Sequence, residues 1–313
     1  MFFMFSGYLF FANIEQLNWT NYSEKLMRRV NSLLTPYIIW NCLAILRFAL
    51  TQFLVPETSN TGLTLTDLTI ADFVGLFWNG YGGNPICYQF WFIRDLIVMC
   101  ILSPLFEILL RKTGIITVIA TGLLWMSPIT MPDGLSTDAI FFFCLGAYIS
   151  KRNIRFTAIY KDTFVIVGLF AIGTLIQIAQ ICETVQISDQ LANIVVQRLT
   201  LLCGCIIIIN IADKCLQFKN IQGGGFLLDV YFFVYGAHTF ILAPIKEILI
   251  RLIPLSSSIN AILIYIFAPM VTVLLCMIVF CFLKKLIPSV LNILTGKRHQ
   301  PQISSSKKIS ECH

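Results

Sequence analysis

Long apolar stretches alternate with short polar segments along most of the 313-residue chain. A spanning helix needs about 20 mainly apolar residues to cross roughly 30 Å of hydrocarbon. Eight stretches come close to that length, and they begin near Leu33, Gln89, Gly114, Leu135, Thr163, Ile194, Phe226 and Ile259. The third and fourth are shorter and contain prolines, so their limits are the least defined. The pattern predicts an all-α, polytopic membrane helical bundle.

A ninth apolar run opens the chain but is too short to span a bilayer. Residues 1–12 are almost wholly apolar, yet twelve helical residues cover only about 18 Å. A signal peptide is the competing interpretation, although no basic segment precedes the run and no convincing cleavage site ends it. We interpret the run as a transmembrane helix that is cut near its start. The predicted total is therefore about nine segments, the first of them truncated.

Basic residues are distributed unequally between alternate loops, and the asymmetry predicts the orientation. Of the 22 Lys and Arg residues, 17 fall in one set of loops and in the tail, three lie within apolar segments, and only Lys246 and Arg251 fall in the opposite loops. Cytoplasmic loops carry the excess of Lys and Arg. We therefore expect the loop of residues 13–32 and the C-terminus to be cytoplasmic and Met1 to be external. One further helix before Met1 would restore a cytoplasmic start.

Composition excludes several classes of protein. The chain is 57% hydrophobic and 12% charged, against about 45–50% apolar and about 25% charged in a soluble domain. A soluble enzyme, a disordered protein and a fibrous protein are therefore excluded. The net charge of +6 lies in clusters between apolar runs, which indicates topology and no nucleic-acid partner. Eleven cysteines, mostly within apolar runs, indicate neither a disulfide framework nor a metal site.

These features predict a multi-pass protein of the cell (inner) membrane, with membrane lipid around most of the chain. Residues 1–295 form the predicted membrane-embedded domain, and residues 296–313 a polar, basic, disordered cytoplasmic tail. The longest polar stretch, residues 56–88, is expected to be external and to hold one short helix around residues 65–78.

Candidate chemistry lies first at the external ends of the predicted helices. Ionisable residues at membrane depth usually mark function or pairing between helices, and seven are found there: Arg47, Arg94, Asp95, Asp138, Arg198, Lys246 and Glu247. A shared level in the bilayer would give a polar cavity that opens outward and suits a hydroxylated acceptor such as a sugar. In the alternative interpretation they neutralise one another as structural pairs or reach the interface.

His238 is a candidate general base. It lies twelve residues into a predicted helix, about 18 Å from the cytoplasmic surface. Tyr231, Tyr235 and His238 follow at i, i+4 and i+7, so they form a polar face that we expect to look into the bundle. A neutral imidazole there can accept a proton from a hydroxyl that attacks an acyl carbon. The alternative is a buried histidine that is bonded to a neighbouring carbonyl.

Lys25, Arg28 and Arg29 form a basic cluster on the predicted cytoplasmic side. If this segment is helical, the i, i+3 and i+4 spacing places all three charges on one side. Such a face can hold the phosphates of a nucleotide-containing donor through charge-assisted hydrogen bonds. Anchoring by the positive-inside rule and contact with anionic lipid explain the same cluster without a donor.

Several segments, in order along the chain, resemble the integral-membrane acyltransferase-3 family. They are the cluster Lys25-x-x-Arg28-Arg29 and the stretches FFMFSGYLFF (2–11), LTPYIIW (34–40), QFWFIRDL (89–96), FCLGAY (143–148) and YFFVYGAH (231–238). The family's Arg-x-x-Arg signature departs here at its first position, which is Lys25. In the family the segment matching residues 6–9 belongs to the second helix, and the first carries an essential Arg and His. We therefore expect the chain as written to be inactive or poorly folded, and activity to return when a preceding helix is supplied.

The resemblance implies an acyl-CoA dependent O-acyltransferase. It would move an acyl group, expected to be acetyl from acetyl-CoA, from the cytoplasm to a hydroxyl of a surface polysaccharide or lipid-linked sugar. Lys25, Arg28 and Arg29 would hold the CoA phosphates, His238 would assist the acceptor, and Arg94 with Asp95 would organise the outer pocket. The alternatives are a glycan transporter or flippase, and an inactive truncated family member. The acyl group, the acceptor and the oligomeric state do not follow from the sequence.

Overall fold

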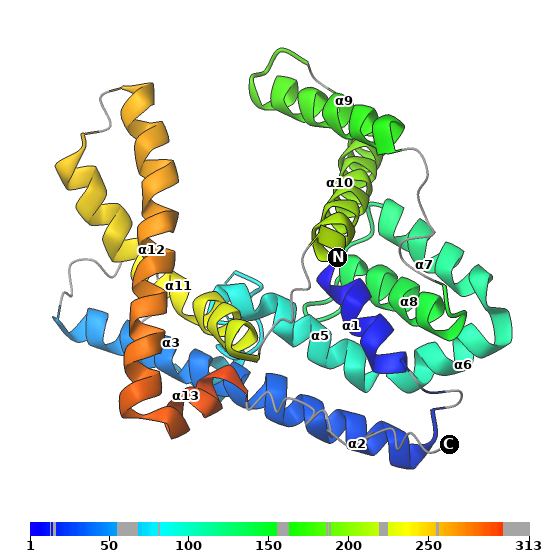
Figure 1. Ribbon diagram of the computed structural model, residues 1–313, viewed down its shortest axis with the longest axis horizontal. Helices are drawn as coiled ribbons and strands as arrows, with labels where there is room; N and C mark the ends of the chain where they lie inside the picture. The colour runs from blue at the N-terminus through cyan, green and yellow to red at the C-terminus, as the bar shows by residue number, and fades with distance from the viewer. Residues whose placement is uncertain are drawn as a thin grey trace, which may run out of the picture. The chain divides into compact units, whose positions relative to one another are not determined.

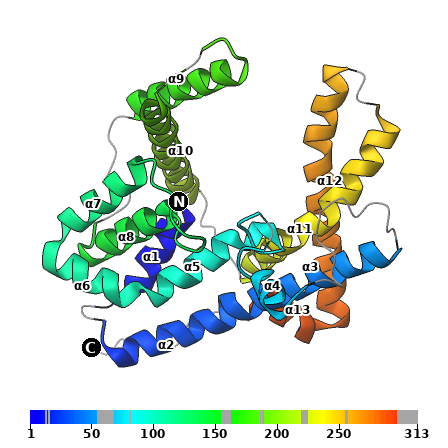
Figure 2. The same cartoon turned by 180° about the vertical axis from the view of Figure 1, so that it is seen from behind.

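The computed structural model is all-helical in the parts of the chain that it describes (Figure 1, Figure 2). These parts are residues 1–12, 14, 17–54, 68–80, 82–154, 163–185, 187, 189–218, 225–254 and 257–296. The predicted tail lies outside the described residues apart from Gly296. The short external helix expected around residues 65–78 is present as α4 (Ile70–Gly75).

Each of the eight long apolar stretches forms helix. The helices are α3 (Thr35–Leu54), α5 (Trp91–Ile101) with α6 (Ser103–Thr113), α7 (Ile115–Met126), α8 (Thr137–Lys151), α9 (Thr163–Ile181), α10 (Gln190–Phe218), α11 (Gly225–Leu252) and α12 (Ser258–Leu286). Among the described residues, five helices are long and apolar enough to cross a membrane: Trp19–Leu54, Phe164–Ile181, Gln190–Cys215, Asp229–Leu252 and Ser258–Leu286. The predicted polytopic helical fold is confirmed. The opening helix, α1 (Phe2–Phe11), and α7 are apolar but shorter.

The segment expected to be a loop at residues 13–32 is helical from Trp19 onward. There α2 (Trp19–Arg29) continues through a π-helical stretch, Val30–Leu34, into α3. The side chain of Asn18 caps α2 by accepting the N–H of Asn21 at 2.8 Å. The sequence left open whether this predicted cytoplasmic connection is helical, and α2 is an amphipathic helix with Tyr22 on its buried side.

The second apolar stretch is divided into two helices. α5 ends at Ile101, and Pro104 lies in the first turn of α6, where its missing N–H leaves no intrahelical bond unmade. The Ser103 hydroxyl donates to the carbonyl oxygen of Cys100 at 2.8 Å. The carbonyl group of Cys100, at the end of α5, therefore has a hydrogen-bond partner although the helix is interrupted.

The helices gather into two compact units. The first contains residues 1–30 and 45–222, and the second contains residues 31–44 and those from 223 onward. In the first unit, α1 and α8 make the most extensive helix–helix contact between described elements, and both views show the two helices side by side (Figure 1, Figure 2).

Two glycines allow α1 and α8 to approach this closely. A Cβ added to Gly7 would overlap the backbone carbonyl of Phe143 on α8, and a Cβ added to Gly146 would overlap the carbonyl of Met4 on α1. Small residues at such positions let helix backbones touch, which is a common device of membrane helices. The rings of Phe10 and Phe11 lie 6.2 and 6.3 Å from the ring of Phe143 and fill the space beside the crossing.

The second unit packs around Trp40 of α3. Its ring lies 5.8 Å from that of Phe233 and 5.7 Å from that of Phe240, both on α11. The indole N–H donates to the carbonyl oxygen of Leu294 at 3.1 Å, which ties the short C-terminal helix α13 (Pro288–Thr295) to α3. Gly236 gives the indole room, because a Cβ there would overlap it.

The glycine crossing can be tested by substitution. Gly146→Ala should destabilise the protein by about 1–3 kcal/mol, because a Cβ that meets backbone atoms cannot be relieved by a rotamer change. Gly168→Ala is the matched control on α9, where a Cβ meets nothing within 4 Å, and it should be neutral or stabilising by about 0.5–1 kcal/mol. The measurement is the thermal unfolding midpoint of the purified protein. Equal midpoints for the two variants would show that the crossing is not closely packed.

Candidate functional site

Lys25 is held by the end of a neighbouring helix. Its ammonium group donates to the carbonyl oxygens of Phe10 and, at 3.3 Å, of Ala12. These carbonyls belong to the C-terminal turn of α1, where they have no intrahelical partner. Lys25 therefore caps α1, and its charge is already engaged.

Arg28 and Arg29 lie one turn further along α2. The Arg28 side chain is 80% exposed and lies 3.9 Å from the carboxylate of Glu24, an exposed pair that contributes little to stability. Arg29 is half-buried. The expected helix is present. Lys25 is bonded to the end of α1, so the guanidinium groups of Arg28 and Arg29 are the two members of the cluster left to bind a donor on the predicted cytoplasmic side.

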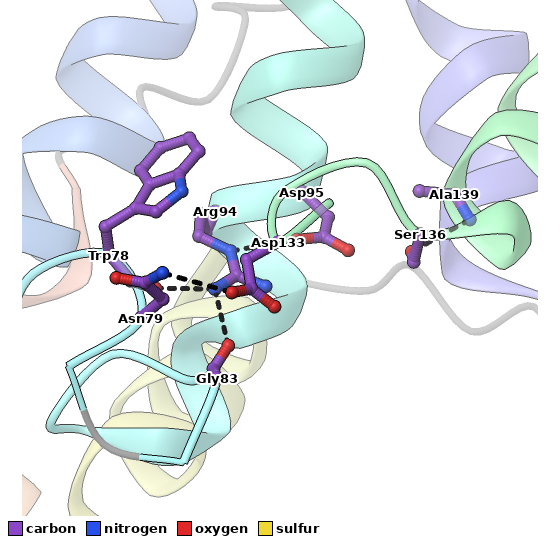
Figure 3. A network of polar contacts seen from close by, with 8 residues as sticks. All are labelled: Trp78, Asn79, Gly83, Arg94, Asp95, Asp133, Ser136 and Ala139. Carbon is purple, nitrogen blue, oxygen red and sulfur yellow. Dashed lines mark hydrogen bonds and ion pairs between the residues drawn. The ribbon is translucent and has the colours of Figure 1, made fainter. Parts of the chain in front are cut away.

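Arg94 and Asp95 form a buried ion pair at the start of α5. The Arg94 Nε donates to Asp95 Oδ1 at 3.0 Å, and the two side chains are only 5% and 1% exposed. The Arg94 Nη1 also donates to the carbonyl oxygens of Trp78 and Gly83, at 2.5 and 3.0 Å (Figure 3). Arg94 thus links the loop before α5 to the helix, and its Nε and Nη1 donors already form hydrogen bonds to protein groups.

A second contact closes the same loop against the segment before α8. The Asn79 side-chain amide donates to Asp133 Oδ2 at 3.1 Å, as Figure 3 shows. Gly134 adopts φ +94°, and a Cβ there would overlap the ring of Trp78. Asn79 and Asp133 are exposed, so this rim, on the predicted external side, offers amide and carboxylate groups at the protein surface.

The other ionisable residues at the predicted external ends are divided among separate contacts. Trp125 Nε1 donates to Asp138 Oδ1 at 2.8 Å, and the guanidinium of Arg198 lies 5.4 Å from the Trp125 ring centre. Glu247 is paired with Arg251 at 2.6 Å in the second unit. The structure therefore brings Asp138 and Arg198 together around Trp125, and it places Lys246 and Glu247 in the other unit.

Cys87, in the loop before α5, is unsuited to nucleophilic chemistry. Burial raises the pKa of its thiol to about 12, although a hydrogen bond with Gln89 and the charge of Arg47 act in the opposite direction. The thiolate is the reactive form, so Cys87 stays protonated and inert at neutral pH.

His238 lies near the middle of α11, about 20 Å from the start of that helix. Its Nδ1 lies 2.8 Å from the carbonyl oxygen of Tyr235 and 3.2 Å from that of Val234. A carbonyl only accepts hydrogen bonds, so in the neutral ring the proton sits on Nδ1 and the lone pair on Nε2. Of the polar face expected from the sequence, Tyr235 and His238 are half-buried, whereas Tyr231 is 64% exposed.

A pocket of about 630 Å³ opens at the predicted cytoplasmic ends of α6 and α8 in the first unit. Its lining includes an ion pair: Lys151 Nζ lies 2.7 Å from Glu107 Oε2 and 2.9 Å from Oε1. Arg111 and Arg152 line the same pocket, with Phe11 on its apolar side. The sequence prediction missed this site. A lone carboxylate inside the apolar stretch around Glu107 was the available signal.

The comparisons with known proteins give one result. Residues 1–281 match the family described as an acyltransferase domain, the acyltransferase-3 family, which is most of the chain. Neither a curated protein nor a solved structure matches significantly.

The Arg94–Asp95 pair gives a prediction about stability. Arg94→Ala should cost about 3–5 kcal/mol, because it leaves the buried Asp95 carboxylate without its partner. The double variant Arg94→Ala/Asp95→Ala should unfold at a higher temperature than the single one, since no buried charge is then left unpaired. Thermal unfolding of both purified variants checks this. A single variant that is as stable as the parent but loses activity would instead assign Arg94 to the chemistry.

Proposed function

The chain belongs to the acyltransferase-3 family of membrane proteins, and we propose that it transfers an acetyl group from cytoplasmic acetyl-CoA to a hydroxyl of a surface polysaccharide or lipid-linked sugar. The proposed location is the cell inner membrane. On the donor side, Arg28 and Arg29 hold phosphate oxygens, and Lys25 positions α2 by its bonds to the end of α1.

The proposal depends chiefly on how the imidazole of His238 is hydrogen-bonded. The bond from Nδ1–H to the Tyr235 carbonyl fixes the ring and leaves Nε2 with its lone pair directed away from that carbonyl. Among the described residues, Nε2 makes no hydrogen bond. A hydroxyl placed beside it can therefore be deprotonated as it attacks the acyl carbon.

The reaction then balances without a metal or redox partner. The acceptor oxygen forms a bond to the thioester carbon as Nε2 takes the hydroxyl proton. The tetrahedral intermediate collapses, the carbon–sulfur bond breaks, and the CoA thiolate takes the proton from the imidazolium. A cationic group near the carbonyl oxygen would stabilise the oxyanion.

The acceptor side is the external rim of the first unit. The Arg94–Asp95 pair holds the loop that carries Trp78 and Asn79, and Asp133 faces Asn79 across the rim. Amide and carboxylate groups next to an exposed aromatic ring are the chemistry that recognises sugar hydroxyls. In this arrangement Arg94 and Asp95 position the acceptor loop and do not touch the acceptor.

The activity can be tested in lipid nanodiscs by comparing the 313-residue chain with a version that is extended upstream in its own gene. The extended protein should transfer label from radiolabelled acetyl-CoA to a glycan acceptor, and no label should transfer without the acceptor. Movement of a glycan across a vesicle membrane without acetylation would instead indicate a transporter.

The role of His238 gives a sharper prediction. His238→Gln should abolish transfer while acetyl-CoA still binds, because an amide cannot take up the proton. Tyr231→Phe, on the same face of α11 but exposed, is the matched control and should keep most of the activity. The assay compares both variants at equal protein in nanodiscs. Full activity in His238→Gln would remove His238 from the mechanism.

The donor cluster gives a prediction about binding. Changing Arg28 and Arg29 together to Gln should weaken acetyl-CoA binding roughly 100-fold, since two charge-assisted bonds are worth about 3 kcal/mol. Changing Lys284 and Lys285 to Gln removes the same charge from the cytoplasmic end of α12 and should leave affinity unchanged. Isothermal titration of the two variants measures the difference. Equal affinities would favour lipid anchoring as the role of Arg28 and Arg29.

A further inference from the structure

The pocket at the cytoplasmic ends of α6 and α8 is separate from the basic cluster on α2. Its lining comes from residues of α1, α6, α8 and the short segments that follow α1 and α8. At about 630 Å³ it falls within the size range of small-molecule sites. None of its residues belongs to the predicted donor cluster, so it is an independent candidate.

The charge of the lining is positive. Three cations, Arg111, Lys151 and Arg152, face one carboxylate, Glu107, which leaves an excess of two positive charges. The Lys151 ammonium donates to Glu107 Oε1 and lies 2.7 Å from Oε2, so the two charges are paired. Among the described residues, neither arginine forms an ion pair, so both guanidinium groups can receive an anion.

The geometry of the α8 end holds these groups in place. After the helix, Asn153 adopts φ +51°, and the N–H of Ile154 donates to the carbonyl oxygen of Ile149 at 3.1 Å. This Schellman-type ending satisfies the last carbonyls of α8 and fixes the chain just beyond Lys151. The guanidinium of Arg152 lies 5.8 Å from the ring centre of Tyr148, which also lines the pocket.

The lining also supplies groups that suit the rest of a phosphorylated ligand. Ser150 and Asn153 contribute neutral hydrogen-bonding groups, and Phe11, Ile14 and Leu110 contribute apolar surface. A purely anchoring cluster of basic residues needs neither a concave shape nor an apolar wall. A concave pocket with an apolar wall and two guanidinium groups that form no ion pair with any described residue is suited to an organic phosphate.

We propose that this pocket binds the phosphate of a small cytoplasmic ligand through Arg111 and Arg152, with the Lys151–Glu107 pair as its fixed floor. The identification of that ligand as the nucleotide end of the acyl donor rests on the proposed function. A lipid headgroup offers the same phosphate chemistry from the membrane side, and the experiment separates the two sources.

The experiment uses the full chain in nanodiscs of zwitterionic lipid and measures the binding of 3′,5′-ADP by calorimetry. Arg111→Gln/Arg152→Gln should weaken binding at least tenfold. Lys112→Gln is the matched control, because Lys112 is exposed beside Arg111 on α6 but does not line the pocket. Adenosine, which lacks phosphate, should bind the parent protein and the double variant equally. Equal 3′,5′-ADP affinity in the parent and the double variant overturns the proposal.

A second measurement on the unaltered protein covers the case in which the double variant does not fold. Saturating 3′,5′-ADP should protect Arg111 and Arg152 from phenylglyoxal, as read by mass spectrometry of peptides. Absence of protection at both overturns the proposal. The same measurements are repeated in nanodiscs that contain phosphatidylglycerol. If the parent protein retains that lipid, the double variant does not, and neither binds 3′,5′-ADP, the pocket binds lipid and the proposal is overturned.

The test of the pocket and the test of the proposed function can fail independently. If 3′,5′-ADP binding depends on Arg111 and Arg152 but no acetyl group is transferred, the pocket stands and the acetyltransferase proposal fails. If transfer proceeds and neither arginine affects binding, the acetyltransferase proposal stands and the pocket assignment fails.

Discussion

The close crossing of α1 and α8 is the contact on which the first unit depends. Because Gly7 and Gly146 let the two backbones touch, the C-terminal end of α1 comes to lie beside the C-terminal end of α8. The carbonyls of that end are then capped by Lys25, and Phe11 becomes a wall of the pocket that Arg152 also lines. A bulkier residue at either glycine would push α1 away from α8, and it would thereby also displace the end of α1 that Lys25 caps and the Phe11 wall of the pocket.

The second constraint is that a buried charge needs a partner of opposite charge. The Arg94–Asp95 pair and the Lys151–Glu107 pair, at the two ends of the first unit, meet this requirement in different surroundings. At the predicted external end, Arg94 donates through Nε and Nη1 to Asp95 and to two loop carbonyls, so the pair holds the loop in place. At the other end, Lys151 is paired with Glu107, and neither Arg111 nor Arg152 forms an ion pair within the part of the chain that the structure describes. A site that must receive an anion needs such a surplus, and a site that only shapes a loop does not.

Hydropathy was sufficient to predict the helices but not their contacts. The apolar stretches predicted eight of them because spanning length and apolar character are properties of a single segment. The predicted cytoplasmic connection at residues 13–32 contains α2, and its amphipathic spacing, which mean hydropathy does not register, favours that helix. The roles of Gly7, Gly146 and Lys25 were not predictable, since each depends on a partner from another helix. Glu107 carried a signal of its own, a lone carboxylate in an apolar stretch.

The two interpretations of His238 that the sequence leaves open are compatible, because the imidazole has two distinct nitrogens. Nδ1 bonds to the Tyr235 carbonyl, as expected for a structural histidine. The same bond sets the tautomer in which Nε2 keeps its lone pair, and this is the condition that a general base must meet. Removing the structural bond would therefore also impair the chemistry, since a ring free to change tautomer presents a proton where a lone pair is needed. Structural order at His238 is in this sense a requirement for its proposed reactivity.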